Sequence, residues 1–153
     1  LYGCGLRISE VCNLKIQDID SCNSRIKVIQ GKGGKDRFTL LPQTLLEQLR
    51  AFYIVENRPK EYFFTSPQTR KQLHVRSLQV VVNGAMQKAG FQSGRFTAHT
   101  LRHSFATHML NQGNNIHVIK TLLGHCKLET TMIYLHFATS YPTRNCFSFG
   151  KIR

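Results

Sequence analysis

Residues 122–136 read Leu122-Leu123-Gly124-His125-Cys126-Lys127-Leu128-Glu129-Thr130-Thr131-Met132-Ile133-Tyr134-Leu135-His136. Gly124 permits the sharp turn that ends a helix, so His125 leaves the helical register. A further helix is predicted over residues 127–136, with an apolar stripe made of Leu128, Met132 and Leu135. Tyr134 lies roughly 120° from that stripe, which favours a reactive side chain over a core residue. A packed tyrosine with a hydrogen-bonded hydroxyl is the alternative.

A second segment with side chains that could bind or react precedes this one. It reads His99-Thr100-Leu101-Arg102-His103. It begins a predicted helix over residues 98–112, which Thr97 could cap and which buries a stripe of Leu101, Phe105 and Met109. His99 and Arg102 are three residues apart and therefore neighbours on the helix surface. A helix N-terminus favours an anion, and a forked guanidinium can bind one. The segment indicates an oxyanion or phosphate site, although a terminal histidine beside a surface arginine fits the same residues.

The rest of the chain predicts a small sheet among helices. Periodicity predicts further helices at residues 6–14, 43–56, 76–89 and 116–123, and strands at residues 25–30 and 37–41. The glycine-rich stretch Gly31-Lys32-Gly33-Gly34-Lys35-Asp36 separates the two strands and is typical of a hairpin loop. Residues 57–75 are expected to be irregular. The sequence therefore predicts one domain over residues 1–153, mainly α with a small antiparallel β-sheet (α+β).

Charge gives an independent indication of the partner. Lys and Arg number 21 against 8 Asp and Glu, a net charge of +13. Such an excess favours a polyanion, most commonly nucleic acid, over a basic surface that only aids solubility. No long apolar run, signal peptide or basic amphipathic helix is evident, so we expect no membrane partner.

The cysteines predict neither a metal site nor a disulfide framework. They are widely spaced, odd in number and without a Cys-x-x-Cys pair: Cys4, Cys12, Cys22, Cys126 and Cys146. Free thiols in a reducing cytosol follow. The stretch from Gly31 to Lys35 superficially resembles a phosphate loop, but it lacks the Gly-x-x-x-x-Gly-Lys-Ser/Thr pattern and precedes a strand, which excludes nucleotide binding there.

Taken in order, five segments resemble the tyrosine recombinase, or phage integrase, family. They are Gly5-Leu6-Arg7-Ile8-Ser9-Glu10 for its arginine helix, Lys32 for its hairpin lysine, His99 and Arg102 for its His-x-x-Arg motif, Leu123-Gly124-His125 for its Leu-Gly-His motif, and Tyr134, nine residues after that histidine, for its nucleophile. The resemblance covers about residues 1–136. It fades beyond His136, and Pro142 would interrupt a long terminal helix.

The resemblance implies a site-specific DNA recombinase or integrase that breaks and rejoins DNA through a 3′-phosphotyrosyl intermediate. Tyr134 would attack phosphorus while Arg7 and Arg102 neutralise the phosphate oxygens. His125 would donate a hydrogen bond to those oxygens, and His99 would accept the tyrosine proton. Lys32 would protonate the leaving 5′-oxygen, with Lys35 as its rival. Glu10 and His103 would support the site. No cofactor and no metal is required, because side chains supply the positive charge.

Family likeness also implies the setting of this reaction. The partner would be double-stranded DNA, bound by a homotetramer of the full-length protein, in the cytoplasm with the nucleoid. The chain would be a catalytic domain truncated at its N-terminus, without the N-terminal DNA-binding (core-binding) domain. Integration and the movement of mobile elements use this chemistry. Type IB topoisomerase-like strand cleavage, an inactive DNA-binding fragment and a purely structural basic domain are the alternatives.

Overall fold

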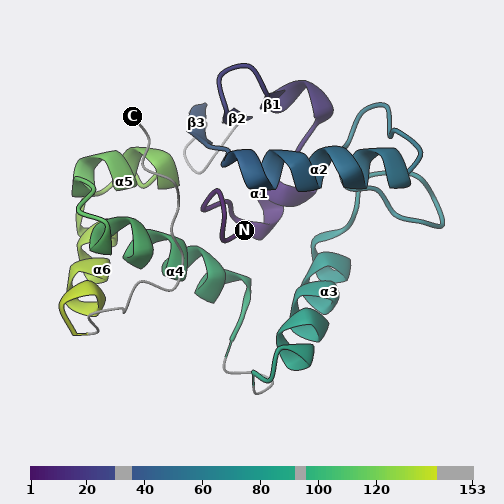
Figure 1. The fold of residues 1–153 in the computed structure, drawn as a ribbon. Helices are drawn as coiled ribbons and strands as arrows, with labels where there is room; N and C mark the ends of the chain where they lie inside the picture. The colour runs from purple at the N-terminus through teal and green to yellow at the C-terminus, as the bar shows by residue number, and fades with distance from the viewer. Residues whose placement is uncertain (30–35, 92–95, 141–153) are drawn as a thin grey trace.

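The computed structural model describes residues 1–29, 36–91 and 96–140 (Figure 1). Its elements are α1 Ile8–Cys12, the 3-10 helix η1 Ile16–Asp18, β1 Ile19–Asp20, β2 Arg25–Val28, β3 Arg37–Leu40, α2 Gln43–Val55, α3 Val75–Lys88, α4 Ala98–Asn111, α5 Ile116–Leu123 and α6 Glu129–Ser140. Helices thus dominate and one small antiparallel sheet accompanies them, which confirms the predicted α+β fold class.

The sheet has the order β1-β2-β3 and is antiparallel throughout. The predicted hairpin is confirmed, with Val28 opposite Arg37, while residues 30–35 lie outside the described residues. Successive side chains of a strand face opposite sides, so Arg37 and Thr39 point inward and Phe38 is 46% exposed. Phe38 packs instead under the guanidinium of Arg25, whose Cζ lies 4.2 Å from the ring centroid. The inner face of β3 therefore carries two polar side chains.

Helix bounds agree with the sequence prediction to within two residues, except at the end of the last helix. The helix predicted at residues 6–14 is reduced to α1, because the backbone of Arg7 is extended, with a ψ of 154°, and the Leu14 carbonyl already accepts the amide of Phe63. The last helix begins two residues later than predicted and continues to Ser140. Strand β1 was not predicted, since two residues are too few to show an alternation.

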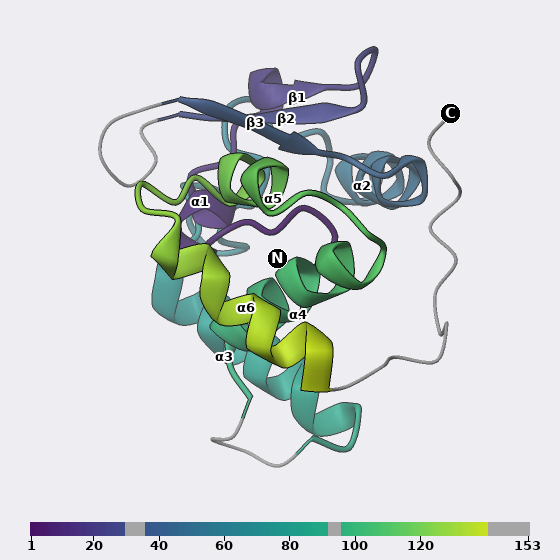
Figure 2. The same ribbon diagram turned by 90° about the vertical axis from the view of Figure 1, so that its left-hand side faces the viewer.

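Two hydrophobic clusters form the interior. The first gathers buried residues of α1, β2, α2 and α3, and the second gathers those of α4, α5 and α6. They meet at Gly5, where a Cβ would lie 2.5 Å from Cδ1 of Phe105 and 3.0 Å from Cδ2 of Leu123. Figure 2 shows α5 between the sheet and the crossing pair α4 and α6. The start of α1 and the end of α5 are thereby brought together.

Helix α6 faces inward with a different side from the one that the sequence predicted. Met132 is 46% exposed and Leu135 also faces solvent, whereas Thr131 and Tyr134 are buried. The predicted stripe of Leu128, Met132 and Leu135 is therefore wrong, and Tyr134, placed off that stripe by the sequence, lies in the core. The hydropathy of α6 is almost uniform around the helix, so the side that packs is decided by its contacts with α4 and α5.

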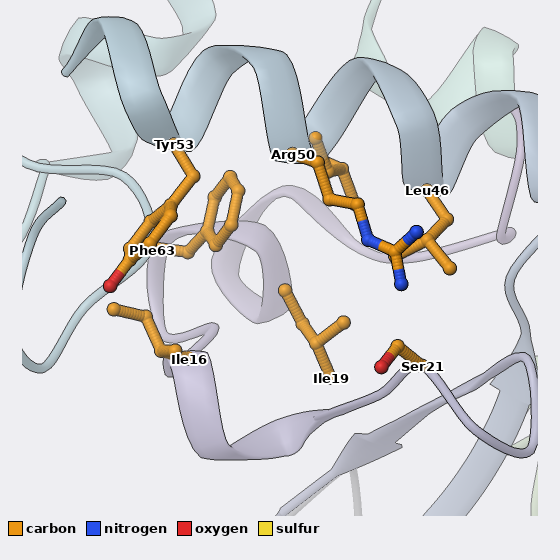
Figure 3. Close-up of a pocket in the computed structure, with 8 residues that line it drawn as sticks. Ile16, Ile19, Ser21, Leu46, Arg50, Tyr53 and Phe63 are labelled. Atoms are coloured by element: carbon orange, nitrogen blue, oxygen red, sulfur yellow. The ribbon is translucent and has the colours of Figure 1, made fainter.

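An apolar groove of about 200 Å³ runs between α2 and η1. Figure 3 shows Leu46, Arg50 and Tyr53 of α2 facing Ile16 and Ile19 across it. None of the predicted site residues lines this groove. Within the described ranges, no helix is both long and apolar enough to cross a membrane.

Candidate active site

Arg7 stands at the N-cap of α1 and is fastened to Glu10 three residues on. Its backbone N–H donates to Oε2 of Glu10 at 2.7 Å, and its Nη1 donates to Oε1 at 2.7 Å. The first of these bonds satisfies the backbone donor of Arg7 at the start of the helix, and the second ties its side chain to the same carboxylate. The Arg7 side chain is partly exposed and lines a polar cleft of about 630 Å³. Arg7 can therefore meet a ligand while Glu10 fixes its direction.

Arg102 comes from α4 and is almost completely buried. Thr97 and Thr100 form the capping box that begins this helix. The Arg102 guanidinium donates from Nη1 to the Gly5 carbonyl at 2.6 Å and from Nη2 to the Leu123 carbonyl at 2.5 Å. Arg102 thus joins the segment before α1 to the end of α5.

Arg37 enters the same region from β3. Its Nη1 and Nη2 donate to the two carboxylate oxygens of Glu10 at 2.9 and 2.8 Å, and its Nε donates to the Leu122 carbonyl at 2.8 Å. Gly124 lies directly against it, since a Cβ there would be 2.7 Å from Cδ of Arg37. Gly124 also has a φ of 64°, so both backbone and space require glycine.

The C-terminal end of α5 therefore meets three guanidiniums. The carbonyls of Leu122, Leu123 and Gly124 accept from Arg37, Arg102 and Arg7 respectively, the last at 3.5 Å. The last carbonyls of a helix have no partner within it and carry partial negative charge. We call the set of Arg7, Arg37, Arg102 and Glu10 the arginine cluster.

Glu10 is the anion at the centre of the arginine cluster. Arg7 and Arg37 bind it directly, and Nη1 of Arg102 lies 3.6 Å from its Oε2. Burial alone raises the pKa of Glu10, but the hydrogen bonds and charges of Arg37 and Arg7 bring it down to about 2. Burial and the neighbouring Arg7 lower the pKa of Arg102 to about 10. One ionised carboxylate thus faces three guanidiniums, which leaves the cluster with excess positive charge.

His125 follows the Gly124 turn and is held by a buried threonine. Its Nδ1 lies 2.9 Å from Oγ1 of Thr131, a fully buried residue of α6. Burial first, and then the charges of Arg102 and Arg7, lower the pKa of His125 to about 4. The imidazole is therefore neutral near pH 7. When Thr131 donates to Nδ1, the proton sits on Nε2 and can be donated to an anion.

Tyr134 is buried, with 3% of its surface exposed, and its hydroxyl has a histidine partner. The Tyr134 oxygen lies 2.8 Å from Nδ1 of His103. His99 lies one turn earlier on α4, with its ring centroid 6.5 Å from that of His103. Burial raises the pKa of Tyr134, and the charges of Arg102 and Arg7 oppose this rise. We call Tyr134, His103, His125 and Thr131 the tyrosine cluster.

Comparison with known proteins shows the family of the chain. A family model described as the phage integrase family matches residues 1–140. The chain belongs to the phage integrase family. The tyrosine recombinase XerA of Thermococcus kodakarensis is 43% identical over 136 residues, which cover 88% of this chain and 47% of that protein. The chain thus spans about half the length of the curated relatives it matches.

Solved structures share the fold of this family member. The crystal structure of XerA recombinase superposes with a TM-score of 0.79 at 32% identity, covering 94% of this chain and 54% of that one. The XerH site-specific recombinase bound to its difH substrate, in a post-cleavage complex, gives a TM-score of 0.78 at 29% identity over 91% of this chain and 40% of that one.

Most of the predicted site residues of this phage integrase family member lie together. The arginine and tyrosine clusters contain Arg7, Glu10, Arg102, His103, His125 and Tyr134. His99 lies beside His103 without a direct contact to Tyr134 among the described hydrogen bonds. Lys32 and Lys35 lie outside the described residues. In the part of the chain that the structure describes, no group of three or more His, Cys, Asp or Glu could hold a metal ion.

Sequence reasoning missed two members of the clusters, Arg37 and Thr131. Arg37 gave one usable signal, since it shares an inward face of an alternating strand with Thr39. Thr131 gave none, because its importance depends on packing that reversed the predicted inner side of α6. The charges of Arg102 and Arg7 lower the pKa of Tyr134, but burial outweighs them, so that pKa is raised overall in the free protein.

Proposed function

We propose that this chain is the catalytic domain of a site-specific DNA recombinase or integrase that breaks and rejoins double-stranded DNA through a 3′-phosphotyrosyl intermediate. The observation that carries the proposal is the place of Tyr134 beside the turn that gathers two guanidiniums. Its ring stacks on His125 with 6.2 Å between centroids, and the carbonyls of Leu123 and Gly124, just before His125, accept from Arg102 and Arg7. A nucleophile beside two forked cations suits attack on a phosphodiester. The net charge of +13 favours the same polyanionic substrate.

The proposed reaction begins with attack of the Tyr134 oxygen on phosphorus. A bond forms between that oxygen and phosphorus, and the bond from phosphorus to the DNA 5′-oxygen breaks. Negative charge collects on the non-bridging oxygens, where Arg7, Arg102 and a neutral His125 would donate hydrogen bonds. Rejoining reverses these steps with a DNA 5′-hydroxyl, so the bond energy is conserved and no nucleotide cofactor is consumed.

Two proton transfers complete the proposal. His103 contacts the Tyr134 hydroxyl at 2.8 Å, and its pKa is lowered by burial and by His99, so it is a neutral base near pH 7. We therefore assign the first acceptance of the tyrosine proton to His103 and retain His99, one turn away, as the alternative acceptor. Lys32 remains the proposed acid for the leaving oxygen, with Lys35 as its rival. In the sequence, Lys35 stands two residues before Arg37 of the arginine cluster.

The surroundings of the site belong to the same proposal. A homotetramer on DNA, in the cytoplasm with the nucleoid, is the arrangement we propose for the full-length protein. Mass measurement of the DNA complex by light scattering would test it. A DNA-bound monomer as the sole species would contradict it.

The function itself is tested with a nicked duplex that traps the covalent intermediate. We expect a denaturant-resistant adduct, with the DNA attached to the peptide that contains Tyr134. If the protein forms the adduct and relaxes supercoiled DNA but never joins a strand to a new partner, type IB topoisomerase-like cleavage is favoured. Binding to DNA without any adduct would favour an inactive DNA-binding fragment.

A further inference from the structure

We propose that Arg37 is a positioning residue for the proposed strand-transfer reaction. It binds both oxygens of Glu10, so that this carboxylate does not offset the attraction of Arg7 and Arg102 for the phosphate. This inference rests on the proposed function. It starts from the fork that Arg37 makes with both oxygens of Glu10, at 2.9 and 2.8 Å.

Arg37 is placed to act through other residues rather than on a substrate. Only 7% of its side chain is exposed, against 20% for Arg7. All three of its nitrogens donate to protein acceptors, two of them to Glu10 and one to the Leu122 carbonyl. Arg37 does not line the polar cleft beside Arg7. Its side chain therefore serves the interior of the arginine cluster.

The charge balance of the cluster explains why this matters. Three guanidiniums and one carboxylate leave two net positive charges, and removal of Arg37 would leave one. Glu10 would then be shared by Arg7 and Arg102, since Arg102 already lies 3.6 Å from it. An anion so close would offset the attraction of both guanidiniums for a phosphate in this partly buried site. By binding both oxygens of Glu10, Arg37 thus keeps this carboxylate from neutralising Arg7 and Arg102.

Arg37 also fixes the turn that presents His125. Its Nε donates to the Leu122 carbonyl, and its Cδ would lie 2.7 Å from a Cβ at Gly124. A shorter side chain at position 37 would leave space beneath the turn and free one carbonyl at the end of α5. Positions of catalytic groups are sensitive to such shifts, because displacement by about 1 Å can lower a rate about a hundredfold.

The test compares two substrates that differ only at the scissile phosphate. One carries the normal phosphodiester, and the other a methylphosphonate, which lacks the negative charge that the arginines neutralise. The native polypeptide that contains this chain is used, with Arg37→Met and, as a matched control, Arg25→Met. Arg25 binds Asp20 at 2.9 Å on the outer side of the sheet, away from Glu10.

We expect Arg37→Met to slow phosphodiester cleavage about a hundredfold and methylphosphonate cleavage much less, while Arg25→Met changes neither appreciably. Equal losses on both substrates would reduce Arg37 to structural support and overturn the inference. If Arg37→Met does not fold, Arg37→Lys is compared on the same two substrates. It keeps the net charge of the cluster but loses the fork on Glu10, so we expect a smaller loss that is still greater on the phosphodiester than on the methylphosphonate. A wild-type protein that forms no adduct would instead overturn the proposed function, and this inference with it.

Discussion

The two halves of the site are held in different ways. The arginine cluster is tied by bidentate and charge-assisted hydrogen bonds among α1, β3, α4 and the end of α5. In the tyrosine cluster, one side-chain hydrogen bond joins His103 with Tyr134, and another joins His125 with Thr131. The pocket proposed to bind the phosphate is thus built before substrate arrives, whereas the proposed nucleophile depends on a contact that must change as its proton leaves.

This contrast predicts that Tyr134 matters to chemistry far more than to folding. Tyr134→Phe should abolish the covalent adduct, because no other group takes the place of its oxygen. The ring still fills the α4–α6 interface, so the free energy of unfolding should fall by about 1 kcal/mol or less. Adduct assays and denaturant titrations measure the two effects. Residual adduct on another tyrosine would remove Tyr134 from its proposed role.

For the arginine cluster, both activity and stability should suffer. Arg102→Lys keeps the charge but cannot bind the Gly5 and Leu123 carbonyls together. Cleavage should slow about a hundredfold to a thousandfold, and the free energy of unfolding should drop by about 2 kcal/mol because buried carbonyls lose their partner. Arg76→Lys, at an exposed position of α3, is the control. Unchanged stability in Arg102→Lys would contradict the preformed pocket.

A smaller effect is expected where the tyrosine cluster orients a histidine. Thr131→Val keeps the buried shape but removes the hydroxyl that contacts Nδ1 of His125. Both neutral tautomers of His125 then become accessible, and cleavage should slow about tenfold, as for other residues that orient a catalytic histidine. Thr130→Val changes the exposed neighbour and should leave the rate unaltered. Equal rates in the two variants would show that Thr131 does not select the tautomer.

Acid should weaken the tyrosine cluster at a milder pH than the arginine cluster. His125 has a pKa of about 4 when folded against an ordinary value of 6.5, so the unfolded chain binds more protons between these values. The free energy of unfolding should therefore fall as the pH decreases from 6.5 towards 4. Glu10, with a pKa of about 2 against 4.5, adds its loss only below pH 4.5.

Denaturant titrations across this pH range provide the measurement. In His125→Gln the fall between pH 6.5 and 4 should be smaller, but still present, because the pKa of His103 is also lowered. The same slope in both proteins would mean that His125 is protonated as easily in the folded chain as in the unfolded one.

Local patterns predicted the elements well, because each depends on neighbours in sequence. The helices of α4 and α5 and the hairpin strands follow from periodicity and from glycine stops such as Gly124. The resemblance to the tyrosine recombinase family also pointed to six residues that the structure brings into two clusters. It could not show which side of α6 packs, so the burial of Tyr134 was missed. Arg37 escaped notice because its partners, Glu10 and Leu122, lie 27 and 85 residues away.

These long separations have a consequence for synthesis of the protein. Arg7 meets Gly124 across 117 residues of chain, and Arg102 meets Gly5 across 97. Closing such long loops costs chain entropy before the contact contributes any favourable free energy, so these contacts form late in folding. Until α5 has left the ribosome, the carbonyls at its end are not available to bind the three arginines of the cluster. The ability to cut DNA proposed here would therefore arise only once translation has passed the Gly124 turn, when the beginning of the domain meets its end.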